Sequence, residues 1–398
     1  MSKPITFLCI SCEFKGMDFL KACKEAGNRV FLVTTKDTEH DAWPRESLDD
    51  IFFMEETVHG VWNMEHFIAG LAHFLRTTQV DRIVALDDFD VEEAAELREH
   101  FRIPGMGQTT ARHFRDKLAM RLKAAEAGLR VPAFTALFND EAINEFVRKV
   151  SPPYMVKPRF EAAAKGILKV NSAEELWQAV HELGEKRHSY LAEKFTPGDI
   201  FHVDALNFGK NVSFTLVSQY LATPWDVAHG GGIFRSVVCE YGDEDDRELT
   251  KFNAGVMKAF GMVHSASHTE FIKSKEDGKF YFLETSSRVG GAHLSDMVEF
   301  ASGINLWKEW AKIETADARG EKYALPPVRK DYAGIVNSLS RFETPDYSPF
   351  SDPEVVWRIG KRHHVGMIVK SERRERVIEL LDRYASLIHQ DFHASMPA

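Results

Sequence analysis

The sequence predicts a protein of mixed class, α/β in its first part and α+β in the remainder. Over the first hundred residues, continuous apolar runs alternate with segments of helical spacing, which is typical of a parallel sheet with helices on both faces. Residues 190–241 are rich in strand-forming side chains, and the C-terminal segment has the pattern of two strands followed by a helix. With 398 residues, the chain is long enough for two or three domains.

The N-terminal unit is expected to contain four strands and three helices. The expected strands are 5–10, 29–34, 50–54 and 82–86, and the expected helices are 16–26, 63–76 and 91–101. No G-x-G-x-x-G follows the first strand, so a dinucleotide site is not indicated. Asp87, Asp88 and Asp90 lie at the end of the fourth strand, where open α/β sheets place functional groups.

Turn residues and apolar spacing predict the elements of the remaining chain. Pro104 and Gly105 end the first unit, and Gly128 is well suited to end the long helix expected at 109–127. Later helices are expected at 173–186, 245–260, 293–301, 305–314 and 371–389, and strands at 154–158, 166–170, 264–273 and 279–285. These elements divide the chain into the units 1–108, 109–190, 191–316 and 317–398.

Charge and composition exclude several classes of protein. The net charge of −10 argues against a large basic surface for nucleic acid. The apolar stretch 5–10 is too short for a signal peptide, and no apolar run approaches the ~18 residues of a membrane span. Four cysteines in a chain of this length do not indicate a disulfide framework, so a reducing, cytoplasmic setting is expected.

Glu270 and Glu284 are the strongest local signal for a functional site. Each lies in an apolar strand, and residues 275–278 between the strands have the composition of a turn. A hairpin centred on Asp277 would place the two glutamates opposite each other, with Cβ atoms ~5 Å apart. Carboxylates that close need a cation between them, and Mg²⁺ commonly bridges carboxylates and phosphates. Alternatively, a two-residue Asp-Gly turn would shift the register by one and place two solvated glutamates on opposite faces.

Arg288 follows Glu284 by four residues and precedes a pair of glycines, Gly290 and Gly291. Its planar guanidinium suits phosphate or carboxylate oxygens, and the glycines let the backbone approach a ligand closely. The helix that follows can point its N-terminal amides at an anion. The alternative is a surface ion pair for Arg288.

A second cationic segment surrounds Lys157, which lies in an apolar strand where its ammonium group needs a partner. Lys165 and the small residues 162–164 follow and fit a loop that closes over phosphates; a lysine whose head reaches solvent is the alternative. The strand end at 193–195 can present backbone groups to an adenine edge, and Asp199 can face a ribose hydroxyl.

Three further features have less specific patterns. Cys9 and Cys12 form a C-x-x-C, which suits a redox pair or half a zinc site, but no second pair accompanies them. The glycines at 230–232 suit either a lid over substrate or a long connection. His268, two residues before Glu270, either contacts substrate or packs in the interior.

In their order along the chain, these segments resemble the ATP-grasp superfamily, and within it the carboxylate–amine ligases, including L-amino-acid ligases. Asp116 and Lys117, followed by 127–132, look like that family's entry to its nucleotide-binding unit. The resemblance extends over roughly residues 5–371. It implies an ATP-grasp fold with an N-terminal pre-ATP-grasp domain (1–108), an A subdomain or lid (109–190), a nucleotide- and metal-binding core (191–316) and a small mixed C-terminal unit (317–398).

The resemblance also implies roles for individual residues. It implies ATP contacts for Lys117, Lys157, Glu193, Lys194, Phe195 and Asp199, metal ligands in Glu270 and Glu284 with Ser286 at the place of a third, and a catalytic Arg288. Lys165 is added to the ATP contacts from its place in the loop, and His268, Gly290 and Gly291 are candidate substrate contacts. Two features depart from the family pattern. Ser286 stands where the family often has an asparagine ligand, and alanines at 162–164 replace the usual glycines of the phosphate loop.

The implied activity is phosphoryl transfer from ATP to a substrate carboxylate, followed by attack of an amine on the acyl phosphate. ATP and Mg²⁺ or Mn²⁺ are the expected cofactors. The expected partners are a small-molecule carboxylate and an amine, with no nucleic acid and no membrane, and a homodimer is one possible assembly. The alternatives are an ATP-grasp enzyme that uses formate or bicarbonate, a non-catalytic nucleotide-binding protein, and a redox protein that uses Cys9 and Cys12.

Overall fold

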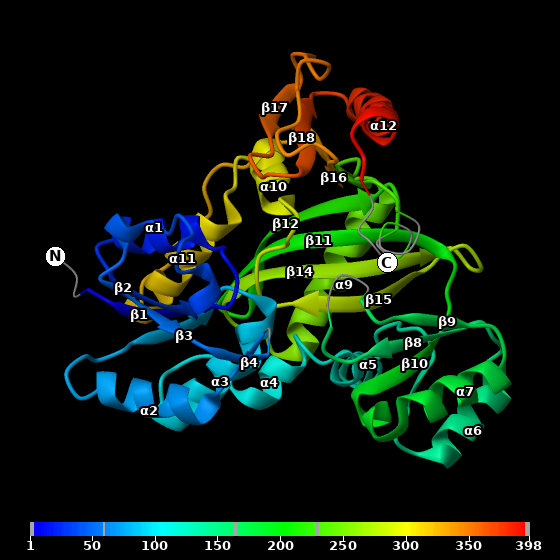
Figure 1. Ribbon diagram of the computed structural model, residues 1–398, viewed down its shortest axis with the longest axis horizontal. Helices are drawn as coiled ribbons and strands as arrows, with labels where there is room; N and C mark the ends of the chain where they lie inside the picture. The colour runs from blue at the N-terminus through cyan, green and yellow to red at the C-terminus, as the bar shows by residue number, and fades with distance from the viewer. Residues whose placement is uncertain are drawn as a thin grey trace.

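The computed structural model describes residues 4–58, 60–161, 165–223, 225, 227 and 231–394 (Figure 1). Three larger sheets organise these residues: a parallel sheet near the N-terminus, a small antiparallel sheet, and a long antiparallel sheet that lies between the two in Figure 1. None of the helices in these ranges is long and apolar enough to cross a membrane.

The N-terminal sheet has the parallel arrangement predicted from its apolar runs. Its strand order is β3-β2-β1-β6, and all neighbouring strands run parallel. The strands are β1 (Thr6–Ser11), β2 (Arg29–Thr35), β3 (Asp50–Met54) and β6 (Arg82–Ala85), and the helices are α1 (Met17–Glu25), α2 (Met64–Phe74) and α3 (Val91–Phe101). A short hairpin of β4 (Glu56–Val58) and β5 (Val61–Trp62) precedes α2.

Alternate residues of β1 enter two different cores, as expected for a sheet covered on both faces. Phe7 joins the core that contains Trp310 of α11 (Leu306–Arg319), whereas Leu8 joins the core that contains Phe67 of α2. Because α11 comes from a distant part of the sequence, this packing ties the N-terminal sheet to the later part of the fold.

The small sheet contains elements that the sequence analysis did not predict. Its order is β7-β10-β8-β9, with antiparallel neighbours. The strands are β7 (Phe134–Ala136), β8 (Tyr154–Pro158), β9 (Leu168–Val170) and β10 (Tyr190–Lys194), and α6 (Asp140–Lys149) and α7 (Ala173–Leu183) pack on them. The three-residue β7 is too short to show an apolar period, whereas α6 was missed although Ile143 and Phe146 stand at helical spacing on its buried face.

The long sheet contains eight strands in the order β15-β14-β11-β12-β13-β16-β18-β17. Its strands are β11 (Gly198–Phe208), β12 (Asn211–Tyr220), β13 (Phe234–Val238), β14 (Ser265–Ser274), β15 (Phe280–Ser286), β16 (Tyr332–Leu339), β17 (Val355–Arg358) and β18 (His364–Ser371). The helices α9 (Glu244–Phe260), α10 (Leu294–Ser302) and α12 (Arg374–Asp391) accompany it. Because β13 pairs with β16, the sheet continues across residue 316, and the division into four units stays a prediction.

The central strands β11 and β14 present alternate residues to two different environments. Phe201 and Phe271 pack with Phe252 of α9 in an aromatic core. The intervening His202 and Glu270 are directly paired across the two strands and point to the opposite face. That face carries the polar groups described below.

The single helix expected at 109–127 is wrong, because two helices occupy this segment. Helix α4 (Gln108–Arg112) ends before Asp116, and α5 (Lys117–Glu126) begins after it. The Asp116 carboxylate accepts a hydrogen bond from the Leu118 N–H at 3.0 Å, so Asp116 is the N-cap of α5. Its extended backbone breaks the helix and places Lys117 at the first helical position.

Candidate nucleotide and metal site

A pocket of about 460 Å³ is lined by residues of the small sheet, the long sheet and α5. Its lining includes every residue predicted to contact ATP and both predicted metal glutamates: Lys117, Lys157, Lys165, Glu193, Lys194, Phe195, Asp199, Glu270 and Glu284. These residues span more than 160 positions of the sequence, and the fold brings them to one place.

The β14–β15 hairpin places Glu270 and Glu284 opposite each other, as predicted. Near the turn the strands are offset by one residue in the direction opposite to that of an Asp-Gly turn, because Phe271 pairs with Phe282, which centres the hairpin between Glu276 and Asp277. An irregularity between Glu270 and Phe271 then restores the pairing of the two glutamates. This offset would also separate the two carboxylates, and the bulge corrects it before the strands reach the pocket.

Lys117 lies directly against one of these carboxylates. Its Nζ atom is 2.8 Å from Oε2 of Glu284 and donates a hydrogen bond to the carbonyl oxygen of Glu161 at 2.7 Å. Burial alone would raise the pKa of Glu284, but the charge of Lys117 and other nearby cations lowers it to about 2. Glu284 is therefore ionised at neutral pH.

A buried ion pair beneath the pocket was missed by the sequence analysis. Arg121 and Glu193 are both 1 % exposed, and their side chains approach to 2.7 Å. Lys157 contacts the other oxygen of Glu193 at 2.8 Å. Burial favours the neutral carboxyl, yet Arg121 and Lys157 outweigh it and lower the pKa of Glu193. The i, i+4 spacing of Lys117 and Arg121 on α5 was the available signal, since such residues share a helix face.

This arrangement changes the expectation for two residues of the predicted ATP site. The side chain of Glu193 points to Arg121 and Lys157, so the backbone at 193–195 is what remains to meet an adenine edge. Lys157 is held by an acidic partner, which excludes the alternative of a lysine that merely reaches solvent.

The rim of the pocket contains exposed ion pairs. Lys194 lies 2.5 Å from Glu276 in the β14–β15 turn, and Asp199 lies 3.4 Å from Lys275 in the same turn. The ammonium of Lys169 lies over the Phe195 ring at 3.8 Å. Residues 162–164 of the expected phosphate loop, and Gly230 of the expected lid, lie outside the described residues.

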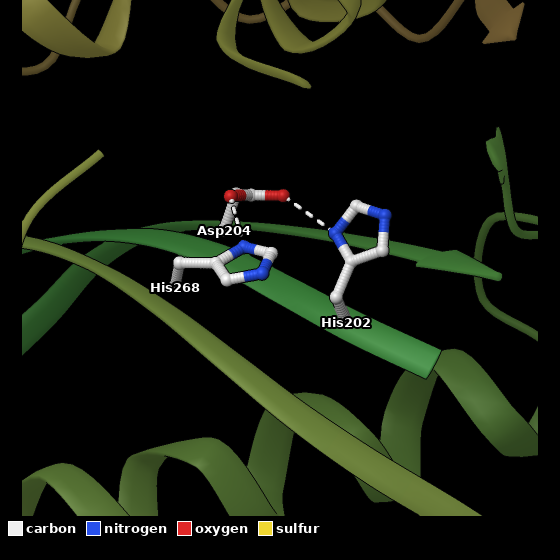
Figure 2. A group of neighbouring side chains, drawn as sticks. All are labelled: His202, Asp204 and His268. Carbon is white, nitrogen blue, oxygen red and sulfur yellow. Dashed lines mark hydrogen bonds and ion pairs between the residues drawn. The ribbon is translucent and has the colours of Figure 1, made fainter. Parts of the chain in front are cut away.

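A closed polar cluster lies on the same face of the long sheet (Figure 2). Asp204 accepts hydrogen bonds from two histidines, at 2.8 Å from Nδ1 of His202 and 2.9 Å from Nδ1 of His268. The Nε2 atom of His202 lies 2.7 Å from the Ser236 hydroxyl oxygen. Burial raises the pKa of Asp204 by itself, but the two histidines lower it well below its usual range. We call His202, Asp204, His268 and Ser236 the histidine cluster.

The histidine cluster reaches the predicted metal site through Tyr220. The Tyr220 hydroxyl donates to Oε1 of Glu270 at 2.9 Å, and Nε2 of His268 lies 3.6 Å from the same oxygen. Burial disfavours a charged His268, but Asp204 and then Glu270 outweigh it and raise its pKa to about 9. Both ring nitrogens of His268 face side chains of this network, so a packed histidine describes it better than a substrate contact.

The glycine segment after β15 packs on the histidine cluster. A Cβ atom at Gly290 would lie 2.9 Å from both Oδ1 of Asp204 and Nδ1 of His268. A larger residue would therefore displace this pair. A Cβ atom at Gly291 would meet no atom within 4 Å, and Ser286 at the end of β15 pairs with His268 across the strands. The predicted ligand and substrate roles of Gly290, Gly291 and Ser286 stay predictions.

Arg288 does not line the pocket and lies toward the N-terminal sheet. Its Nε atom is 3.8 Å from Oδ1 of Asp88, which is beyond hydrogen-bond length. Asp87 pairs with Lys15, and this charge together with Arg288 lowers the pKa of Asp87 against the effect of burial. Arg288 therefore faces acidic groups at the carboxyl end of β6, from a distant part of the chain.

The Asp90 carboxyl group is held by hydrogen bonds inside the N-terminal unit. Its carboxylate accepts hydrogen bonds from the Cys12 N–H at 2.9 Å and the Trp62 ring N–H at 2.7 Å. Cys9 and Cys12 are buried free thiols, and burial raises both pKa values well above the usual range. A neutral buried thiol is a poor nucleophile and a poor metal ligand, so the structure gives no support to the redox alternative.

The residues of the pocket fit a hard divalent cation. Two carboxylates face each other across neighbouring strands, and oxygen atoms are the donors that Mg²⁺ prefers. The pocket also gathers Lys117, Lys157 and Lys165, which suits the phosphates of a nucleotide. The donor set thus agrees with the metal and nucleotide expected from the sequence.

Comparisons with known proteins find ligases among the similar sequences. No protein-family model matches the sequence. The L-arginine-specific L-amino acid ligase of Bacillus subtilis is 26 % identical over 250 residues, which cover 61 % of this chain and 60 % of that protein. A D-alanine–D-alanine ligase of Dechloromonas aromatica is 25 % identical over 224 residues, or 55 % of this chain and 72 % of that ligase.

A solved structure extends the similarity to the whole chain. The L-amino acid ligase from Bacillus licheniformis superimposes with a TM-score of 0.75 at 19 % identity, over 100 % of both chains. This likeness shows the fold, which is that of ATP-grasp proteins, as the sequence predicted. The sequence match to the Bacillus subtilis relative spans about 60 % of that relative's length.

Proposed function

We propose that this chain, which has the ATP-grasp fold, is an ATP-dependent carboxylate–amine ligase. It would activate a carboxylate, an amino acid or another small acid, as an acyl phosphate and couple it to an amine, with release of ADP and phosphate. The observation that carries the proposal is the pairing of Glu270 with Glu284 in one pocket with Lys117 and Lys157.

The nucleotide would lie between the small sheet and the long sheet. The backbone at 193–195 would meet the adenine edge, and Asp199 at the rim would meet the ribose. Lys117, Lys157 and Lys165 would hold the phosphates, because ammonium groups provide concentrated positive charge in a chain of net charge −10. Nucleotide phosphates would draw Lys117 away from Glu284, which frees that carboxylate for a cation.

Glu270 and Glu284 would hold Mg²⁺ or Mn²⁺, with Ser286 as a further neutral oxygen. When bound, the ion supplies charge neutralisation at the phosphate oxygens. The two glutamates are ready for this role because the bulge keeps them on one face and Glu284 is ionised.

The proposed reaction has two displacements. A carboxylate oxygen of the acid attacks the γ-phosphorus of ATP, and the bond to the β-phosphate oxygen breaks to give ADP. The amine nitrogen then attacks the acyl carbon, phosphate leaves, and the amine loses a proton to solvent. Lys117 and Lys157 would position the transferred group, and Arg288 would stabilise charge on the acyl oxygen. No nucleophilic side chain is needed.

The test is a screen for ADP and phosphate release over amino acids, singly and in pairs, followed by mass spectrometry of the products. We expect ADP release to require both an acid and an amine, with one condensed product for each ADP. Binding of ATP without ADP release across the panel would favour a non-catalytic nucleotide-binding protein. Release that depends on formate or bicarbonate would instead indicate the other enzyme class.

A further inference from the structure

Tyr220 is a buried residue of the pocket wall for which the sequence predicted no role. It is the last residue of β12 and is 6 % exposed. Its ring is held between His202, at a centroid distance of 4.7 Å, and Phe234, at 5.6 Å. A ring packed on both sides has little freedom to turn, so the position of the hydroxyl is set by the fold.

The Tyr220 hydroxyl has one proton, and it donates that proton to Oε1 of Glu270 at 2.9 Å. Glu270 is one of the two paired carboxylates of the proposed metal site. A donor fixed on Oε1 restricts rotation of the carboxylate and leaves Oε2 available. His268 stands behind the same oxygen at 3.6 Å and is itself anchored by Asp204.

The two glutamates differ in the kind of partner that holds them. Glu284 is paired with the cation Lys117, a partner that nucleotide phosphates can also attract. Glu270 is held by a neutral hydroxyl whose ring is packed in the protein interior. The Tyr220 contact does not depend on a cation that nucleotide phosphates attract, so it can persist when a metal ion and a nucleotide enter.

We infer that Tyr220 is a positioning residue that orients Glu270 for the divalent cation used with ATP. This inference rests on the proposed metal site and adds a determinant of metal affinity outside the predicted ligands. Groups that orient metal ligands typically change metal affinity by about 10–100-fold when they are removed.

The experiment compares Tyr220→Phe with a matched control, Tyr332→Phe. Tyr332 lies in β16 and donates its hydroxyl to Glu240, which is not part of the pocket lining. Each variant removes the hydroxyl of a tyrosine in a β-strand, and in each case that hydroxyl donates a hydrogen bond to a glutamate. Binding of a non-hydrolysable ATP analogue is measured by calorimetry at increasing Mg²⁺, which requires neither acid nor amine.

We expect Tyr220→Phe to need roughly tenfold more Mg²⁺ for half-maximal analogue binding, with binding restored at saturating metal. Tyr332→Phe should match the unsubstituted protein. An unchanged Mg²⁺ requirement in Tyr220→Phe, or a loss that saturating Mg²⁺ or Mn²⁺ does not restore, would overturn the inference. Analogue binding without any ADP formation from acid and amine would count against the ligase proposal alone, since the metal comparison does not depend on it.

Discussion

The pocket wall and the histidine cluster both include strands of the long sheet, but their charged side chains differ in exposure and in the partners that hold them. Side chains of His202 and Asp204 are 0 % exposed and satisfy each other, whereas Lys117 and Glu284 are 12 % and 35 % exposed at the pocket. A closed network has a single low-energy arrangement. An ion pair that borders a pocket can exchange its partner for a ligand, so the pocket wall is suited to binding and the cluster to holding geometry.

Replacing Glu284 tests the pocket wall most severely. Glu284→Ala should lower ADP formation by about a thousandfold or more, because it removes a metal carboxylate and leaves Lys117 without that partner. Glu276→Ala is the control, since Glu276 pairs with Lys194 at the rim. Steady-state ADP release measures both variants, and substantial residual turnover in Glu284→Ala would count against the metal assignment.

Arg121→Met tests the buried pair that supports the pocket. The change should lower the free energy of unfolding by about 3–5 kcal/mol, because Glu193 is left buried with one cation fewer. Arg362→Met removes an arginine that is 78 % exposed from its pair with Glu343, and should cost less than ~1 kcal/mol. Chemical denaturation measures both. Equal losses would mean that the buried pair contributes no more than a surface pair.

Arg288→Ala separates binding from product formation. The variant should bind ATP normally, because Arg288 is outside the pocket lining, but product formation should fall by about 10²–10³-fold. Nucleotide titration and product analysis by mass spectrometry provide the two readouts. Normal product yield would remove Arg288 from its proposed role.

The pH dependence of stability tests the histidine cluster and has the smallest expected effect. The pKa of Asp204 is below its ordinary value of 3.8 in the folded state, so the unfolded chain binds the proton more readily. The stabilisation that ionised Asp204 gives the folded state is therefore present above pH 3.8, and it is lost as the pH falls toward the lower pKa of the folded state. The slope of stability against pH should be steeper than in Asp204→Asn by up to about 1.4 kcal/mol per unit.

This slope is obtained from denaturation curves between pH 3 and pH 6, measured for both proteins in the same buffers. Identical slopes for the unsubstituted protein and Asp204→Asn would show that Asp204 is not held as an ion between the histidines.

Most of the fold and much of the pocket could be predicted from local patterns in the sequence. The parallel N-terminal sheet followed from continuous apolar runs, because a strand buried on both faces must be apolar throughout. The predicted ATP residues and both glutamates line one pocket, since each belongs to a local pattern of strand end, turn or helix start. Tyr220 was missed because nothing in its neighbouring residues distinguishes it from a core position, whereas Arg121 was missed although its i, i+4 spacing from Lys117 on α5 was an available signal.

The sequence by itself determined most of the elements, their order and the residue types available for nucleotide and metal. Only the tertiary structure decided which charges meet. The register of Glu270 and Glu284 depends on a bulge, Glu193 meets Arg121 across 72 positions, and Arg288 meets Asp88 across 200. Local patterns are set by the period of a helix or a strand, whereas the pairing of distant charges is set by how sheets and helices pack, which no short segment encodes.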